Sequence, residues 1–219
     1  MKKQFFFACI FLFLSAVCQS QAAFPAYADN IQNFKKRDSI NPPPANAILF
    51  VGSSSFTRWN NLDSYFPEYS IINRGFGGST LADVIRYCYD IILPYQPKQV
   101  IIYCGENDLA ENVSVNEVVN RFKTLFQMIR LNLPTTVIHF VSLKPSPSRR
   151  AFLPKIKEVN DQAEAFLKGE KNAGFINVYP YMLDEKGEII EDIFLADKLH
   201  MNEKGYAIWR KRIQPYLIK

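Results

Sequence analysis

Three consecutive serines follow an apolar run in the first third of the chain. The run ILFV leads into Gly52, and Ser53, Ser54 and Ser55 come next. Three hydroxyls at the end of a strand fit a solvated turn, a loop that binds a phosphate group, or a nucleophile for acyl transfer. The three serines alone do not separate these alternatives.

A nucleophilic serine needs a general base, and the chain contains two histidines. His139 lies in the middle of the apolar segment TVIHFV, which predicts a core position away from the ends of the strands. His200 lies in the polar segment LADKLHMNEKGY, three residues after Asp197. This spacing lets the carboxylate bond one ring nitrogen and leaves the other free, although the same pair also suits a loop that leads into a helix.

Two further polar loops follow apolar runs. Residues 74–80 read RGFGGST, and residues 105–109 read GENDL. Acyl transfer forms an oxyanion that needs hydrogen-bond donors about 2.7–3.1 Å away, and glycine backbone N–H groups and asparagine amides supply such donors. Each loop taken alone is more typical of ordinary turn chemistry. Together with the serines and the Asp–His pair, the loops complete the set of groups that acyl transfer requires.

The elements that must position these loops are short apolar runs that alternate with helical patterns. After an extended NPPPAN segment, we expect strands at residues 47–51, 69–73, 99–104, 136–142 and 175–179. We expect helices at residues 81–92 and 115–131, from Pro154 onward, and at 203–214. The alternation predicts an α/β fold with a parallel sheet covered on both faces, in which ligands bind at the carboxyl ends of the strands.

The four loops resemble, in order, the sequence blocks of the SGNH hydrolases, also called the GDSL esterase/lipase family. GENDL is similar to the Gly-x-Asn-Asp block, NRGFGGST to the block with the oxyanion glycine, and Asp197 and His200 to the final Asp-x-x-His block. The first block departs from the usual Gly-Asp-Ser, since Ser53 stands in the Asp position as in many members. The resemblance implies a three-layer α/β/α sandwich with a mainly parallel, flavodoxin-like five-stranded sheet.

The resemblance also implies a role for each matching residue. The family's serine is the second residue after the glycine, so Ser54 is the expected nucleophile, with His200 as base and Asp197 as the residue that orients it. The expected oxyanion hole comprises the backbone N–H groups of Ser54 and Gly78 and the side-chain amide of Asn107. The resemblance implies no metal and no cofactor.

Composition and charge narrow the class of protein. The chain has 219 residues, of which 48% are hydrophobic and 21% are charged, as in globular proteins. Residues 1–22 read as a secretory signal peptide, with two lysines before an apolar stretch and small residues near the expected cleavage site. We therefore expect an exported protein with one domain at residues 23–219. A lipoprotein anchor at Cys18 is the weaker alternative, because Val17 occupies a position that favours a small residue.

Loss of residues 1–22 lowers the formal charge from +5 to +3, because the segment has two lysines and no acidic residue. A charge this small does not indicate a nucleic-acid partner, and no membrane-spanning segment is expected in the mature chain. Cys88 and Cys104 lie in apolar segments, which predicts buried free thiols. The sequence does not set the oligomeric state.

The expected substrate is a small or carbohydrate ester with a short, acetyl-like acyl group. The loops are short, which predicts an open site without a lid, and export suits a carbohydrate esterase by analogy. Arg74 and Trp59 are candidate sugar-binding residues, although both also suit packing near the rim. Two alternatives to an esterase are a flavin mononucleotide protein that uses the serine loop for phosphate, and a sugar-binding protein on an inactive hydrolase scaffold.

Overall fold

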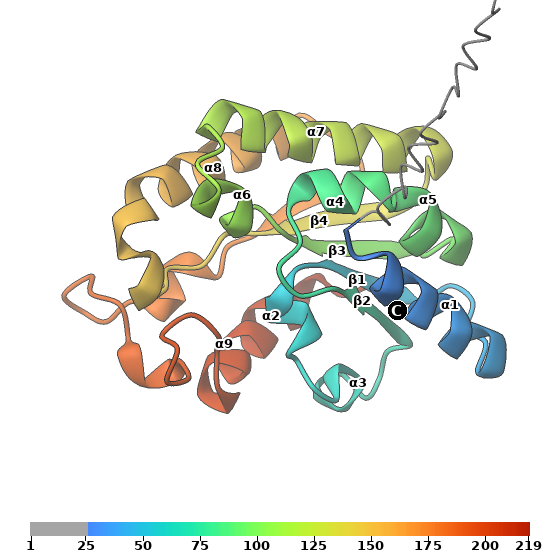
Figure 1. The fold of residues 1–219 in the computed structure, drawn as a ribbon, viewed down its shortest axis with the longest axis horizontal. Helices are drawn as coiled ribbons and strands as arrows, with labels where there is room; N and C mark the ends of the chain where they lie inside the picture. The colour runs from blue at the N-terminus through green and yellow to red at the C-terminus, as the bar shows by residue number, and fades with distance from the viewer. Residues whose placement is uncertain (1–25) are drawn as a thin grey trace, which may run out of the picture.

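A parallel five-stranded sheet forms the centre of the computed structural model, which describes residues 26–219 (Figure 1). The expected signal peptide lies outside the described residues. All five expected strands are present, with shifted ends. They are β1 (Ile48–Gly52), β2 (Ile71–Gly75), β3 (Gln99–Tyr103), β4 (Val137–Val141) and β5 (Ala173–Ile176).

The order of the strands fixes where the polar loops meet. The sheet runs β2-β1-β3-β4-β5 and every neighbouring pair is parallel, which is the flavodoxin-like order and confirms the expected fold class. The order in which successive strands are added to the sheet reverses between β1 and β3, although both strands run in the same direction. The serine loop and the GENDL loop leave these two neighbouring strands, so they lie side by side at the crevice where such folds bind ligands.

Helices cover both faces of the sheet (Figure 1). Figure 1 shows α4, α5, α6, α7 and α8 on one side and α2, α3 and α9 on the other, with α1 beside the edge strand β2. Their bounds are α1 Ala28–Ile40, α2 Ser54–Thr57, α3 Leu62–Tyr65, α4 Leu81–Arg86, α5 Cys88–Ile91, α6 Glu106–Ala110, α7 Val115–Asn132, α8 Leu153–Leu167 and α9 Glu203–Ile213.

The hydrophobic core has one aromatic cluster on each side of the sheet. Phe50 of β1 packs against Phe56 and Trp59, with ring centroids 5.1 and 6.5 Å away. On the opposite side, the ring centroids of Phe122 on α7 and Phe140 on β4 are 4.3 Å apart. The apolar stripe of α7 is buried as its spacing predicts: Val118, Phe122, Leu125, Phe126 and Ile129. Among residues 26–219, no helix combines the length and the apolar composition needed to cross a bilayer.

Three sequence expectations differ from the structure. The helix expected at 81–92 is two short helices, because the backbone at Tyr87 leaves helical geometry. β5 ends before Asn177, because the Ser142 hydroxyl accepts hydrogen bonds from the backbone N–H groups of Val178 and Tyr179 (2.9 and 3.1 Å) in place of a strand partner. No helix was expected at α1, whose only buried residues are Ile31 and Phe34.

The end of β1 requires a glycine. Gly52 has a φ of +141°, and a Cβ there would lie 1.9 Å from the backbone oxygen of Tyr103 on β3. Neither the conformation nor the space admits a side chain.

We expect Gly52→Ala to lower the free energy of unfolding by at least about 3 kcal/mol, because it adds an overlap with backbone to an unfavourable φ. The matched control is Gly187→Ala, where φ is +79° but nothing lies within 4 Å of the added Cβ. This control variant should lower the free energy of unfolding by only about 1–2 kcal/mol. Urea unfolding of both variants measures the difference, and equal losses would contradict the close approach of β1 and β3.

Candidate active site

The residues on either side of Ser54 form hydrogen bonds to other elements, which hold Ser54 in place. The Ser53 N–H donates to the Tyr103 carbonyl oxygen (3.1 Å), and the Tyr206 hydroxyl of α9 donates to the Ser55 carbonyl oxygen (2.9 Å). Ser53 and Ser55 are buried, whereas Ser54 is partly exposed at the first position of α2. Of the three serines, Ser54 is therefore the one whose hydroxyl can reach a substrate.

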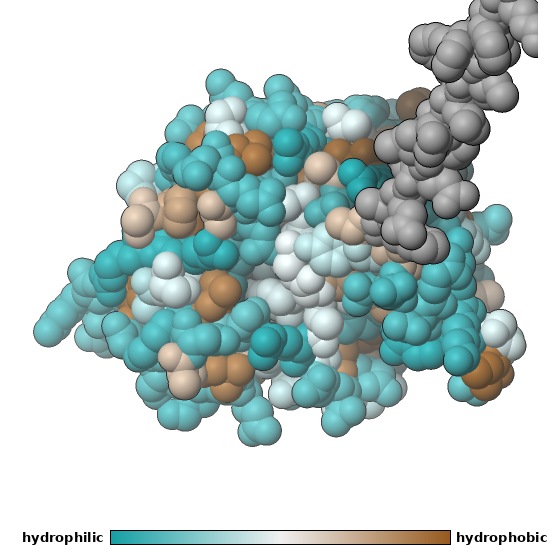
Figure 2. All heavy atoms as spheres, in the orientation of Figure 1, coloured by the Kyte–Doolittle hydropathy of each residue, from teal (hydrophilic) through white to brown (hydrophobic). Residues whose placement is uncertain are grey.

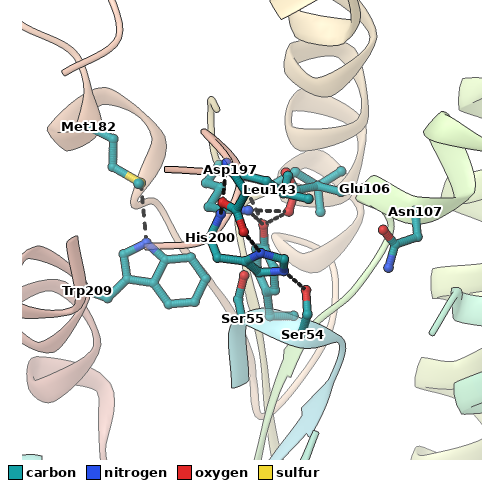
Figure 3. A network of polar contacts seen from close by, with 12 residues as sticks. Ser54, Ser55, Glu106, Asn107, Leu143, Met182, Asp197, His200 and Trp209 are labelled. Carbon is teal, nitrogen blue, oxygen red and sulfur yellow. Dashed lines mark hydrogen bonds and ion pairs between the residues drawn. The ribbon is translucent and has the colours of Figure 1, made fainter. Parts of the chain in front are cut away.

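A continuous hydrogen-bonded chain joins Ser54, His200 and Asp197 (Figure 3). His200 Nε2 lies 3.0 Å from Ser54 Oγ, and His200 Nδ1 lies 2.6 Å from Asp197 Oδ2. Ser54 and His200 are 146 residues apart in the sequence, and Asp197 is three residues before His200. The geometry is that of a nucleophile, a base and an orienting carboxylate.

The loop at Asp197 fixes the histidine as well as bonding to it. Asp197 Oδ1 accepts hydrogen bonds from the backbone N–H groups of Leu199 (3.0 Å) and His200 (2.9 Å). Desolvation raises the pKa of Asp197, but the hydrogen bonds from the His200 ring and from these N–H groups outweigh it and leave the pKa well below its usual range. The carboxylate is therefore ionised at neutral pH and favours a proton on His200 Nδ1.

The oxyanion donors expected from the sequence belong to Ser54, Gly78 and Asn107. Figure 3 shows Asn107 on the side of Ser54 opposite the His200 ring. The Asn107 amide donates one hydrogen bond to the Ser79 carbonyl oxygen (3.0 Å), which orients it and leaves a second N–H free. Gly78 is exposed, and its φ of +86° is one that glycine adopts readily. The Ser54 N–H lies at the start of α2, where N–H groups have no partner within the helix.

Asp108 ties two of these loops together. It is fully buried, and its carboxylate accepts hydrogen bonds from the Leu81 N–H and the Arg121 guanidinium (both 2.9 Å). Burial raises the pKa of Asp108, although both of these hydrogen bonds lower it. Through Leu81, this carboxylate holds the segment that carries Gly78 against the segment that carries Asn107. The sequence pairs Asp108 with Asn107 in one block but does not indicate this supporting contact.

Comparison with known proteins identifies the family. Residues 47–208 match the model of the GDSL-like lipase/acylhydrolase family. The chain belongs to this family. No curated protein sequence matches the chain significantly.

Solved structures of GDSL-type proteins share the fold. A Streptococcus pneumonia protein described as a putative platelet activating factor is 22% identical, with a TM-score of 0.76 over 87% of this chain and 92% of its own. A GDSL-like lipase from Bacteroides thetaiotaomicron is 21% identical, with a TM-score of 0.74 over 85% and 96%. An acetylxylan esterase from Geobacillus stearothermophilus is 13% identical, with a TM-score of 0.64 over 78% and 94%. At these identities the likeness establishes the fold.

Trp59 and Arg74, the two residues expected to bind substrate, are buried in the structure. Trp59 is 2% exposed and is stacked on Tyr206, with ring centroids 4.9 Å apart. Arg74 is 8% exposed, because its guanidinium bonds the Asp38 carboxylate and the Tyr95 hydroxyl. Both side chains are part of the packing, so the expectation that they contact a sugar is wrong.

Other expectations from the sequence are confirmed. His139 is buried against Gln99, 3.0 Å from its amide, and burial lowers the pKa of His139 to about 4, so it stays neutral in the core. Cys88 and Cys104 are buried free thiols, and burial raises the pKa of Cys88 to about 11. Neither the histidine nor the cysteines take part in the site.

A buried ion pair that was not expected from the sequence lies next to Asn107 in the chain. Lys144, which follows β4, is 1% exposed, and its Nζ donates to Glu106 Oε2 (2.7 Å). The Tyr103 hydroxyl donates to the same oxygen. Burial, followed by the Glu106 charge, raises the pKa of Tyr103, which keeps the hydroxyl protonated. Glu106 precedes Asn107 directly, so this pair supports the backbone that carries the amide donor.

We expect Lys144→Met to lower the free energy of unfolding by about 3–5 kcal/mol, because it leaves the Glu106 carboxylate buried without a partner. Adding Glu106→Gln should restore part of that loss by removing the unpaired charge. Urea unfolding of the two single variants and the double variant measures the coupling. A loss below about 1 kcal/mol for Lys144→Met would contradict a desolvated ion pair.

Proposed function

We propose that this GDSL-family protein is an exported serine esterase that removes short acyl groups, acetyl above all, from hydroxyl groups of carbohydrates. The observation that carries the proposal is the hydrogen-bonded chain from Ser54 through His200 to Asp197. The two alternatives, a phosphate-binding serine loop and an inactive sugar-binding scaffold, do not explain why these three side chains are joined by hydrogen bonds or why the carboxylate is fixed.

The proposed reaction begins at Ser54. His200 Nε2 accepts the hydroxyl proton while Ser54 Oγ attacks the ester carbonyl carbon, and the carbonyl oxygen becomes an oxyanion. The N–H groups of Ser54 and Gly78 and the Asn107 amide stabilise this charge. Asp197 stabilises the protonated ring.

The intermediate then collapses as the bond to the alcohol oxygen breaks. His200 Nε2 gives its proton to that oxygen, and the acyl group remains on Ser54 Oγ. A water molecule attacks the acyl carbon while Nε2 accepts one of its protons. Collapse of this second intermediate releases the carboxylic acid and returns the proton to Ser54 Oγ.

The surroundings of the serine favour a short acyl group on a large alcohol. Gly77, Gly78 and Asp197 are exposed, and Ser54 lies at an open rim rather than under a cover. A bulky alcohol can approach such a site, whereas a long acyl chain finds little apolar surface to bury. One protein with the same fold is named an acetylxylan esterase, that is, an enzyme for an acetylated polysaccharide, and this supports the proposal by analogy.

Export is the second part of the proposal. It is supported by the Lys2–Lys3 pair, the apolar stretch after it and the small residues near Ala22. Expression of the full chain in a bacterial host, followed by N-terminal sequencing of the periplasmic protein, tests it. A protein that keeps residues 1–22 would contradict it.

We expect Ser54→Ala to lower kcat on p-nitrophenyl acetate by roughly 10³-fold or more, because it removes the nucleophile. Ser53→Ala and Ser55→Ala are matched controls that remove a neighbouring hydroxyl and should stay within about tenfold of the original protein. The acetate, butyrate and octanoate esters compared by kcat/KM should rank in that order. Full activity in Ser54→Ala, or a preference for octanoate, would overturn the respective assignment.

We expect Asp197→Asn to lower kcat by roughly 10²–10⁴-fold with KM changed little, because the amide no longer fixes the proton on His200 Nδ1. Steady-state kinetics on p-nitrophenyl acetate measure both constants. Asp192→Asn is the control, since that carboxylate is exposed and pairs with Lys204. A variant that instead raises KM at constant kcat would show that Asp197 acts in binding.

A further inference from the structure

A polar cleft opens beside the catalytic serine, between α1 and the β2 edge of the sheet. Its volume is about 480 Å³, which is within the range of small-molecule sites. In Figure 2, strongly hydrophilic residues cover α1 next to a paler strip in the middle of this face. The cleft is lined by Asn30, Asn33, Phe34, Lys36, Arg37, Thr57, Asn73 and Gly75.

The cleft reaches α2 at Thr57, one helical turn from Ser54. Ser54 and Thr57 lie three residues apart on α2, so their side chains share one face of the helical turn. A Cβ placed on Gly77 would lie 3.9 Å from Ser54 Cβ and 4.0 Å from Thr57 Oγ1. Gly77, which is exposed and has no side chain, therefore lies close to both Ser54 and Thr57.

The positive charges in the cleft are not neutralised. Lys35 of the same helix pairs with Asp90 (2.5 Å), and Arg74 behind the cleft pairs with Asp38. Lys36 and Arg37 form no ion pair with any residue of the described segment 26–219. The Arg37 guanidinium lies 5.1 Å from the centroid of the Phe34 ring, which holds it by a cation–π contact and leaves its N–H groups available.

The polar groups of the cleft divide into structural and available ones. The Asn73 amide donates to the Phe56 carbonyl oxygen (2.8 Å) and its Oδ1 accepts from the Gly75 N–H (2.9 Å), so this residue shapes the wall. Asn30 and Asn33 are exposed on the face of α1 that carries Phe34 and Arg37. Two amides and two cations beside one aromatic ring suit a ligand that has hydroxyl groups and a negative charge.

We propose that this cleft binds an anionic sugar unit, recognised by its carboxylate, on the alcohol side of the ester. The proposal rests on the esterase function proposed above and specifies its substrate class: an acylated polysaccharide that contains uronic-acid residues. Arg37 bonds the carboxylate through its planar guanidinium, Lys36 adds a second charge, and Asn30 and Asn33 bond sugar hydroxyls. The ester group then lies over Ser54, one helical turn away.

The first test compares an anionic and a neutral ester. The variant Lys36→Gln/Arg37→Gln should lower kcat/KM for 4-acetoxybenzoate by about tenfold or more and leave p-nitrophenyl acetate within about twofold. Lys35→Gln is the matched control, because it removes one positive charge from the same helix outside the cleft. It should change the ratio of the two kcat/KM values by less than about twofold. An equal loss on both esters, or the same effect from Lys35→Gln, would overturn the proposal.

The second test does not depend on turnover. Galacturonate should raise the melting temperature of the Ser54→Ala protein and of the original protein, and should not raise that of Lys36→Gln/Arg37→Gln. Galactose is the neutral control, and glucose 6-phosphate distinguishes a preference for phosphate from one for carboxylate. A shift with phosphate alone, or an equal shift in the double variant, would contradict a carboxylate site. If neither ester is hydrolysed, the esterase proposal fails, and this measurement still decides whether the cleft binds an anionic sugar.

Discussion

The arrangement of the site depends on how closely the last residue of β1 approaches β3. The Tyr103 carbonyl oxygen occupies the place of a side chain at Gly52 and accepts the Ser53 N–H, so the chain must turn there into α2. Because β1 and β3 adjoin at the reversal of strand order, this turn exposes Ser54 beside the loop that carries Asn107. Ser54 and Asn107, the proposed nucleophile and amide donor, are therefore positioned by backbone contacts.

Below this turn, buried charges add to the hydrophobic contacts that hold the loops together. Asp108 joins the loop after β2 to the loop after β3, and the Glu106–Lys144 pair joins β3 to the segment after β4. Each charge is costly to bury, and Glu106 Oε1 has no partner among residues 26–219. Such networks favour one arrangement of the loops over others, and the proposed oxyanion hole, whose donors come from three separate loops, requires that selectivity.

The sequence predicted those features that depend on short-range patterns. Buried parallel strands are continuous apolar runs, and the stripe of α7 repeats at helical spacing, so both were found. The spacing allowed Asp197 to pair with His200, and the family resemblance selected both this pair and Ser54 among the three serines. The burial of Lys144 was not predictable, because its partner lies 38 residues away, and α1 was missed because only Ile31 and Phe34 of its 13 residues are buried.

The missed helix separates the chemistry of this protein from its proposed specificity. The family match begins at residue 47, whereas α1 ends at Ile40, so the helix that lines the cleft lies outside the part of the chain that carries the proposed triad. Asp38 and Phe34 attach α1 to Arg74 on β2, next to the segment that leads to Gly78. We therefore expect residue changes on the face of α1 that lines the cleft to alter which alcohol the proposed site accepts, without disturbing Ser54, His200 or the proposed oxyanion donors.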